Sequence, residues 1–291
     1  MPDKQKPSFF IIGGGRAGAS LAYYFARRGY QVLSLVERNP GRYNFLKQEL
    51  AWSFLAHRIH YDILAKSDIL LLTVRDDQIQ EIASKLAATA NQWREKIAAH
   101  TSGAAPSSVL LPLRERGALV ASLHPVYSFA SDPRENHRMN EIWLNAEGDD
   151  AALEAFEDIF RHTQNRVIRV SEEQKKAIHL ACVFYANFYV ALADISREIL
   201  SDTLNLEHDV FSMLNPLLSS SIEQVHEFGT RQALTGPIKR ADIKTISTHL
   251  EFLQSKHPDL LDAYITLSRR LISMADLMEK DKKRLNQLLD K

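Results

Sequence analysis

The sequence predicts an α/β protein: a doubly wound, mostly parallel Rossmann sheet over residues 1–170, followed by an all-helical domain over residues 171–291. Between residues 9 and 170, short apolar runs alternate with helical patterns, an order typical of a parallel sheet. After residue 171, apolar residues recur at spacings of three and four without a convincing strand, which indicates helices. The 291 residues also exceed one ordinary domain, so two domains are expected.

A glycine-rich turn joins the first predicted strand, residues 9–12, directly to a helical stretch. In this setting Gly13 permits the tight turn, Gly15 leaves the backbone open to a pyrophosphate, and Gly18 lets the helix lie close to the sheet. The start of the helix adds unpaired N–H groups and the positive end of its dipole. We therefore predict that this loop binds a dinucleotide. Its predicted binding residues are Gly13, Gly14, Gly15, Arg16, Ala17 and Gly18.

The second predicted strand, residues 31–36, ends beside Glu37 and Arg38. In such folds an acidic residue near this end favours NAD, and a basic residue accommodates the 2′-phosphate of NADP. Val36 takes the place where NAD enzymes usually carry Asp, whereas Arg38 lies just beyond it, with Arg42 behind. We therefore expect NADP, with NAD as the alternative. A merely solvated turn is the other interpretation of Glu37 and Arg38.

Three further predicted strands end at Val74, at Thr101 and just before His124. Because ligands of parallel sheets bind beyond the carboxyl ends of the strands, we expect these ends to form one site. Val74, Thr101 and Ser102 would border the nicotinamide, and His124 would contact the substrate. Ser102 is interpreted as a hydrogen-bond donor, because no general base has a sequence-fixed position next to it. For His124, a turn stabilised by local side-chain bonds is an equal alternative.

The first helix of the second predicted domain carries Lys175, His179 and Asn187, at spacings of four and eight residues. These three side chains can lie on one broad face of the helix. Asn187 stands in an apolar stretch, where an unpaired amide is costly, so we expect it to be hydrogen-bonded. The pair His179 and Asn187 is therefore a candidate catalytic pair. The alternative is a core asparagine bonded to nearby backbone beside a structural histidine.

A second candidate substrate contact lies at Gly236-Pro237, a tight turn that opens a helix. The exposed N–H groups of this turn and the guanidinium of Arg240 could hold a carboxylate or a phosphate. The alternative is a surface ion pair between Arg240 and Asp242.

The charge balance excludes several classes of protein. Lys+Arg and Asp+Glu are both 36, so nothing supplies the field that attracts nucleic acid or an anionic membrane. The single cysteine, Cys182, excludes an internal disulfide and a cysteine-rich metal site, and no metal is predicted. The polar start shows no signal peptide, and we find no apolar stretch of membrane-spanning length, so a cytoplasmic protein is expected.

The order of these motifs resembles a bacterial family of Rossmann-like proteins with a C-terminal helical domain of unknown function. Its members are described as candidate NADP- or deazaflavin-dependent oxidoreductases. The resemblance spans nearly the whole chain. More remotely, the layout is similar to the 6-phosphogluconate and 3-hydroxyisobutyrate dehydrogenase superfamily, and to pyrroline-5-carboxylate and ketopantoate reductases. The motifs that carry the resemblance are the glycine loop and residues 100–103, 123–129, 179–187 and 234–242.

The resemblance implies hydride transfer from NADP to the C=O or C=N of a small keto or imino acid, such as a ketopantoate-like acid, between the two domains. His179 takes the place of the lysine that serves the substrate hydroxyl in the hydroxyacid enzymes, and Val183 takes the place of their asparagine. His179 would then donate the proton, Asn187 and His124 would orient the carbonyl oxygen, and Arg240 would hold the acid group. The layout also implies a homodimer through the helical domain.

Two alternatives to this reductase stay open. Because the superfamily lysine is absent, the chain could be a sensor or scaffold protein that binds NADP without turnover. A reductase that uses deazaflavin is the other alternative.

Overall fold

The computed structural model describes residues 6–89, 93–204 and 210–290. The chain forms two compact units, Met1–Ala186 and Asn187–Lys291. The sequence predicts the boundary after residue 170, where the last predicted strand ends. The contacts place it 16 residues later, because helix α7 (Glu172–Cys182) inserts the buried side chain of Lys175 against strands of the first unit.

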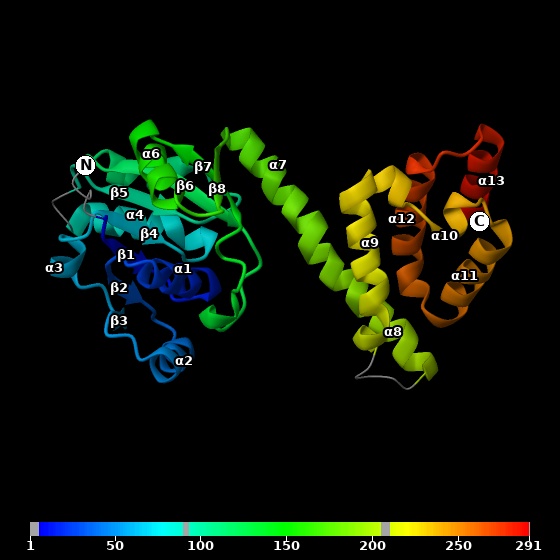
Figure 1. Cartoon of the computed structure of the whole chain (residues 1–291), viewed down its shortest axis with the longest axis horizontal. Helices are drawn as coiled ribbons and strands as arrows, with labels where there is room; N and C mark the ends of the chain where they lie inside the picture. Colours follow the sequence, from blue (N-terminus) through cyan, green and yellow to red (C-terminus); the bar gives the residue numbers. More distant parts are fainter. Residues whose placement is uncertain (1–5, 90–92, 205–209, 291) are drawn as a thin grey trace. The chain divides into compact units, whose positions relative to one another are not determined.

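The first unit contains an eight-stranded sheet in the order β3-β2-β1-β4-β5-β6-β7-β8 (Figure 1). All neighbouring strands pair in parallel except β6 and β7, which are antiparallel. The predicted Rossmann sheet is thus confirmed. The strands are β1 (Phe9–Ile12), β2 (Val32–Val36), β3 (Leu55–Ala56), β4 (Ile69–Leu72), β5 (Ile97–His100), β6 (Leu119–Val126), β7 (Trp143–Gly148) and β8 (Arg166–Arg169).

Helices cover both faces of this sheet. Successive residues of β1 point to opposite faces, so Phe9 and Ile11 join one core and Phe10 and Ile12 join the other. Helices α1 and α6 supply the first core, and α4 and α5 supply the second. The helices are α1 (Arg16–Arg27), α2 (Pro40–Leu50), α3 (Tyr61–Leu64), α4 (Asp76–Thr89), α5 (Leu111–Arg114), α6 (Asp150–Phe160), α7, and the 3₁₀ turns η1 (Ser107–Leu110) and η2 (Pro133–Glu135).

Strand β6 is longer than the sequence predicts. It continues to Val126, because β7 pairs with it in antiparallel register as far as Trp143. His124 therefore lies inside a strand, opposite Asn145, rather than in a turn after the strand.

The second unit is helical throughout its described residues, as predicted. A small core forms among α10 to α13, around Ile238, Ile246, Ile272 and Leu285. Helices α8 and α9 pack against each other but expose many apolar side chains. The elements are α8 (Phe188–Leu204), α9 (Val210–Ala233), α10 (Gly236–Lys239), α11 (Ile243–Lys256), η4 (Pro258–Leu260), α12 (Leu261–Met274) and α13 (Glu279–Leu289).

The expectation that the chain has no apolar stretch of membrane-spanning length is wrong. Residues 172–201 form a helical run that is long and apolar enough, by length and composition, to cross a membrane. No residue in the most apolar 18-residue stretch of this run is buried. The run includes a π-helical turn, Val183–Asn187, between α7 and α8. A single helix that meets this test of length and composition is weak evidence of a membrane span.

Candidate functional site

The glycine loop has the geometry that a pyrophosphate requires. Gly13 has φ +112°, and a Cβ there would lie 2.7 Å from the carbonyl carbon of Thr73. A Cβ at Gly18 would clash with the carbonyl oxygen of Gly13, which also accepts a 2.6 Å hydrogen bond from Thr73 Oγ1. Gly15 is exposed, and a Cβ there would meet no atom within 4 Å. The loop is therefore tight on its inner side and open on its outer side, so its residues fit a dinucleotide.

Arg42 fixes the shape of this loop. Its Nε donates to the carbonyl of Gly14 at 2.8 Å, and its Nη1 donates to the carbonyl of Ser131 at 2.8 Å. Glu37 packs over Gly14, where a Cβ would lie 2.8 Å from the Glu37 Cβ, and its Oε1 accepts from the Asn39 amide at 2.6 Å. Arg42 and Glu37 thus have structural partners, which leaves Arg38 as the cation of this strand end that is available to a ligand.

Arg38 lines a cavity of about 340 Å³ next to the ends of β1 and β2. Arg58, which follows β3, and Lys85 of α4 line the same cavity. Lys85 pairs with Glu81, whereas neither guanidinium has an ion pair among the described residues. The position of Arg58 was missed in the sequence, although it follows the short strand that pairs with the end of β2. The two guanidinium groups of this cavity could hold an anionic group of a nucleotide.

A polar row crosses three strands on the face of the sheet that α4 covers. His100, Ser122 and Glu147 are neighbours in register across β5, β6 and β7, and all three are buried. On the same face, His124 stands opposite Asn145. The sequence signal was an alternation of polar residues at 122 and 124, and again at 145 and 147. It was missed because the antiparallel pairing of β7 was not predicted.

Lys175 of α7 enters this polar row and is 1% exposed. Its ammonium contacts Ser122 Oγ and lies 3.8 Å from Glu147 Oε1. The same carboxylate accepts from the Ser107 amide at 2.5 Å and from the Ser107 hydroxyl at 2.7 Å. Burial lowers the pKa of Lys175 to about 8, against the opposing effect of the Glu147 carboxylate. Lys175 and Glu147 therefore form a buried charged pair within this polar row.

His100 and Ser102 are engaged in local structure. The carbonyl of Pro106 can only accept, so His100 Nε2 donates to it at 3.1 Å, and His100 Nδ1 accepts from the Ser102 amide at 3.2 Å. Burial, and then Lys175, lowers the pKa of His100 to about 4. The Ser102 hydroxyl accepts from the amides of Ala104 and Ala105, so it shapes the turn that follows β5. Thr101 and Val74 are half-buried at the neighbouring strand ends.

His124 and His179 meet over Gly103. Their ring centroids are 5.8 Å apart, and the rings are nearly perpendicular. A Cβ at Gly103 would lie 2.8 Å from His124 Nε2 and closer still to His179 Nδ1. Gly103, which was not predicted as a site residue, thus lets both imidazoles approach its backbone more closely than a side chain would allow.

The hydrogen bonds assign a proton position to His124. The Asn145 amide nitrogen lies 3.0 Å from His124 Nδ1, and because this nitrogen only donates, the imidazole proton is on Nε2. Burial, then Lys175 and His179, lowers the pKa of His124 to about 4. His179 Nδ1 is buried without a hydrogen-bond partner among the described residues. The two histidines therefore present a neutral donor, His124 Nε2, and an unpartnered ring nitrogen, His179 Nδ1.

The other two candidates, Asn187 and Arg240, belong to the second unit, and both are exposed. Because Asn187 is exposed in the single chain, its amide can bond to water, and the alternative of a core asparagine is not observed. No ion pair between Arg240 and Asp242 is found in the described part of the chain: Asp242 caps α11 by accepting from the Thr245 amide at 3.1 Å and its hydroxyl at 2.8 Å.

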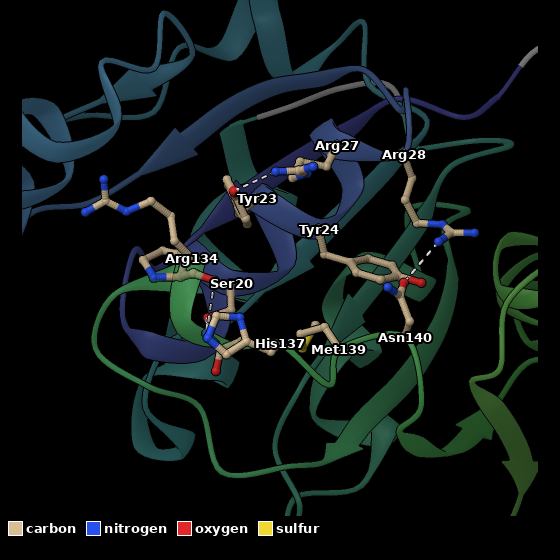
Figure 2. Close-up of a pocket in the computed structure, with 11 residues that line it drawn as sticks. Ser20, Tyr23, Tyr24, Arg27, Arg28, Arg134, His137, Met139 and Asn140 are labelled. Carbon is tan, nitrogen blue, oxygen red and sulfur yellow. Dashed lines mark hydrogen bonds between the residues drawn. The ribbon is translucent and has the colours of Figure 1, made fainter.

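A separate cavity of about 310 Å³ lies along α1 (Figure 2). Arg27 donates to the Tyr23 hydroxyl at 3.1 Å, and Arg28 donates to Asn140 Oδ1 at 3.0 Å. None of the strand-end residues lines this cavity. It is therefore distinct from the candidate site.

Two solved structures share this fold over nearly their whole length. One, from Bacteroides fragilis and described as a candidate NADP oxidoreductase, is 23% identical with a TM-score of 0.77, covering 92% of this chain and 98% of its own. An imine reductase from Myxococcus stipitatus in complex with NADP⁺ is 15% identical with a TM-score of 0.64, covering 96% and 99%. These identities establish a common fold.

A third structure is a pyrroline-5-carboxylate reductase from Coxiella burnetii, 14% identical with a TM-score of 0.58, covering 98% of this chain and 99% of its own. No curated protein matches the sequence. Residues 3–125 match the model of a Rossmann-like domain, and residues 142–271 match the model described as Domain of unknown function (DUF2520). The chain thus joins a Rossmann-like domain to a C-terminal domain of unknown function, as the resemblance implied.

Proposed function

We propose that this chain is an NADP-dependent reductase that delivers hydride to the C=O or C=N of a small keto or imino acid. The observation that carries the proposal is the His124–His179 pair facing Gly103 at the strand ends. The fold shared with an imine reductase and a pyrroline-5-carboxylate reductase supports it.

The cofactor half of the proposal rests on the glycine loop and the cavity beside it. The open outer side of Gly15 would receive the pyrophosphate. Arg38 and Arg58 would bind the 2′-phosphate, since guanidinium groups form paired hydrogen bonds with phosphate oxygens. When bound, the nicotinamide supplies the hydride.

The substrate half rests on the two imidazoles. Reduction of C=O or C=N leaves an oxygen or nitrogen that must take up a proton, and an imidazole titrates in the range that such a step needs. His179 would donate this proton. His124, with its proton on Nε2, would donate a hydrogen bond to the same atom and hold it in place.

Asn187 and Arg240 remain proposed substrate contacts. Asn187 ends a π-helical turn, a feature that often marks functional positions. Arg240 follows the Gly236 turn, and its carboxylate neighbour Asp242 is occupied with Thr245. Its exposed guanidinium would therefore bind the acid group of the substrate.

We further propose a homodimer through the helical unit. Apolar side chains of α8 and α9, among them Tyr189, Phe211 and Leu217, line a cavity of about 280 Å³. Leu217 is 68% exposed in a single chain. An exposed apolar surface of this kind is typical of an interface, and a second copy of the same surface would cover it.

NADPH oxidation at 340 nm, measured with a panel of keto and imino acids, tests the reductase. We expect NADPH to bind and at least one acid to be reduced, and His179→Gln and Asn187→Ala to slow turnover without weakening NADPH binding. Binding without oxidation of NADPH by any acid would favour the sensor or scaffold instead. A spectral titration with deazaflavin separates the third alternative, because only that cofactor would then support turnover.

A further inference from the structure

Lys175 is the buried group that the proposed reaction leaves unexplained. Its ammonium and the Glu147 carboxylate are both almost fully removed from water, at 1% and 7% exposed. Burying two charges costs free energy that their attraction only partly returns, so a buried pair is weak evidence for a purely stabilising role. This pair lies within the row of polar side chains that leads to the two imidazoles.

The strand register connects Lys175 to His124. Ser122, which the ammonium contacts, and His124 are two residues apart on β6, so their side chains share one face of the sheet. Glu147 and Asn145 repeat this spacing on β7, directly opposite. The Lys175–Glu147 pair thus lies two residues along the strands from the His124–Asn145 pair.

We propose that Lys175 is a positioning residue: its buried ammonium group keeps His124 neutral with its proton on Nε2, and thereby leaves His179 as the proton donor of the pair. The assignment of the donor rests on the proposed function. The effect on His124 is a property of the protein without substrate.

The charged and titratable groups around His124 favour this assignment. Burial most strongly disfavours a proton on His124, followed by Lys175 and then His179 of α7, whereas Asp76 at the start of α4 favours one. The neighbouring His100 of β5 has both ring nitrogens in hydrogen bonds and is itself disfavoured as a cation by burial and by Lys175. Among the charged groups around His124, Lys175 thus acts most strongly against its protonation.

The neutral form matters for the geometry at Gly103. A second proton would go to Nδ1 of His124, which accepts from Asn145, and this hydrogen bond would be lost. Two cationic imidazoles facing one small volume would also repel each other. A neutral His124 keeps its proton on Nε2, the ring nitrogen that lies next to Gly103.

The test is a pH titration of the imidazole Cε1–H signals by NMR in the whole protein without substrate. His124→Gln assigns the His124 signal. Lys175→Met combined with Glu147→Gln removes both buried charges, so neither is left uncompensated. Lys175→Arg keeps the charge, and Lys176→Met is the matched control on the exposed side of the same helix.

In the wild-type protein the His124 signal is expected not to titrate above pH 5. In the Met/Gln double variant its midpoint is expected to rise by on the order of one pH unit. Lys175→Arg and Lys176→Met should both resemble the wild type. An unchanged midpoint in the folded double variant overturns the proposal, as does a wild-type His124 that titrates near pH 6.5.

The pH profile of kcat/KM tests the second part of the proposal, that His179 is left as the proton donor. Because a second imidazole becomes protonatable in the double variant, its acid limb is expected to move to higher pH, while that of Lys176→Met stays in place. An unmoved limb contradicts the link to His179. If the wild-type protein reduces no acid, the proposed function and the role of His179 fail together, and the NMR titration still decides the effect of Lys175 on His124.

Discussion

Gly103 is the residue at which the substrate half of the site is most sensitive to one added atom. In Gly103→Ala the new Cβ would lie 2.8 Å from His124 Nε2 and closer still to His179 Nδ1, so it would displace the imidazoles. We expect kcat/KM to fall at least about tenfold, which corresponds to about 1.4 kcal/mol of lost transition-state stabilisation, with an unchanged Kd for NADPH. Equal losses of activity and of NADPH affinity would contradict the assignment of Gly103 to the substrate half of the site alone.

Gly15 provides the complementary test in the cofactor half. In Gly15→Ala the Cβ meets no protein atom within 4 Å, so the free protein should keep its Tm. The same Cβ would stand where the backbone approaches the pyrophosphate, and the Kd for NADPH is expected to rise at least about tenfold. An unchanged Kd, measured by fluorescence titration, would place the pyrophosphate elsewhere.

Arg38 and Arg58 are where the proposed preference for NADP over NAD can be tested. Each Arg→Ser substitution should weaken NADPH binding by about tenfold or more, because hydrogen bonds between charged groups contribute about 1.5–3 kcal/mol, and should leave NADH binding nearly unchanged. The control is Arg75→Ser, which removes an exposed cation paired with Asp77 outside this cavity. Equal losses for both cofactors would assign these residues to the shared part of the nucleotides.

At the scale of elements, the local signals were sufficient for the glycine loop and the parallel strands. The apolar run before Gly13 and the helix after Gly18 determine that turn by themselves, since every contact it needs is close in the chain or on the next strand. The polar row was different. Glu147 meets Ser122 only because β7 turns antiparallel, and the partner of a strand depends on contacts that sequence spacing does not encode.

Helix α9 is where the proposed dimer can be tested. Leu217→Glu would place a charge in the apolar cavity between α8 and α9, and we expect it to shift a dimer toward monomer in light scattering coupled to size exclusion. Leu111→Glu is the control, because Leu111 is a similarly exposed leucine, on α5 of the first unit. A wild-type monomer at micromolar concentration would refute the interface.

At the scale of the whole molecule, the hydrophobic cores of the two units arise from different sequence patterns. The sheet of the first unit is buried on both faces, so its strands appear as unbroken apolar runs that are easily located. The core of the second unit is small, and α8 and α9 expose much of their apolar surface. The period of three and four therefore predicted helices correctly there but did not distinguish residues that face a core from residues such as Asn187 that face solvent.

The buried histidines make the stability of the folded chain depend on pH in one direction. The pKa of His100 and of His124 is lowered from 6.5 to about 4, so the unfolded chain binds more protons between these values. The stability these neutral rings contribute is present above pH 6.5 and is lost as the pH falls toward 4. Each full shift corresponds to on the order of 3 kcal/mol.

The denaturant midpoint should therefore fall steeply between pH 6.5 and 4, and His124→Gln should reduce that slope. His137→Gln, which changes an exposed histidine of the same unit, is the control and should leave that slope unchanged.

Lys175 also makes the folded chain more stable as the pH rises, but at higher pH. Because its pKa is lowered from 10.5 to about 8, the unfolded chain binds more protons between these values. Stability should rise further between pH 8 and 10.5 in the wild type but not in the Lys175→Met and Glu147→Gln double variant. A flat profile in both ranges would mean that these groups are hydrated in solution, which would remove the basis for a neutral His124.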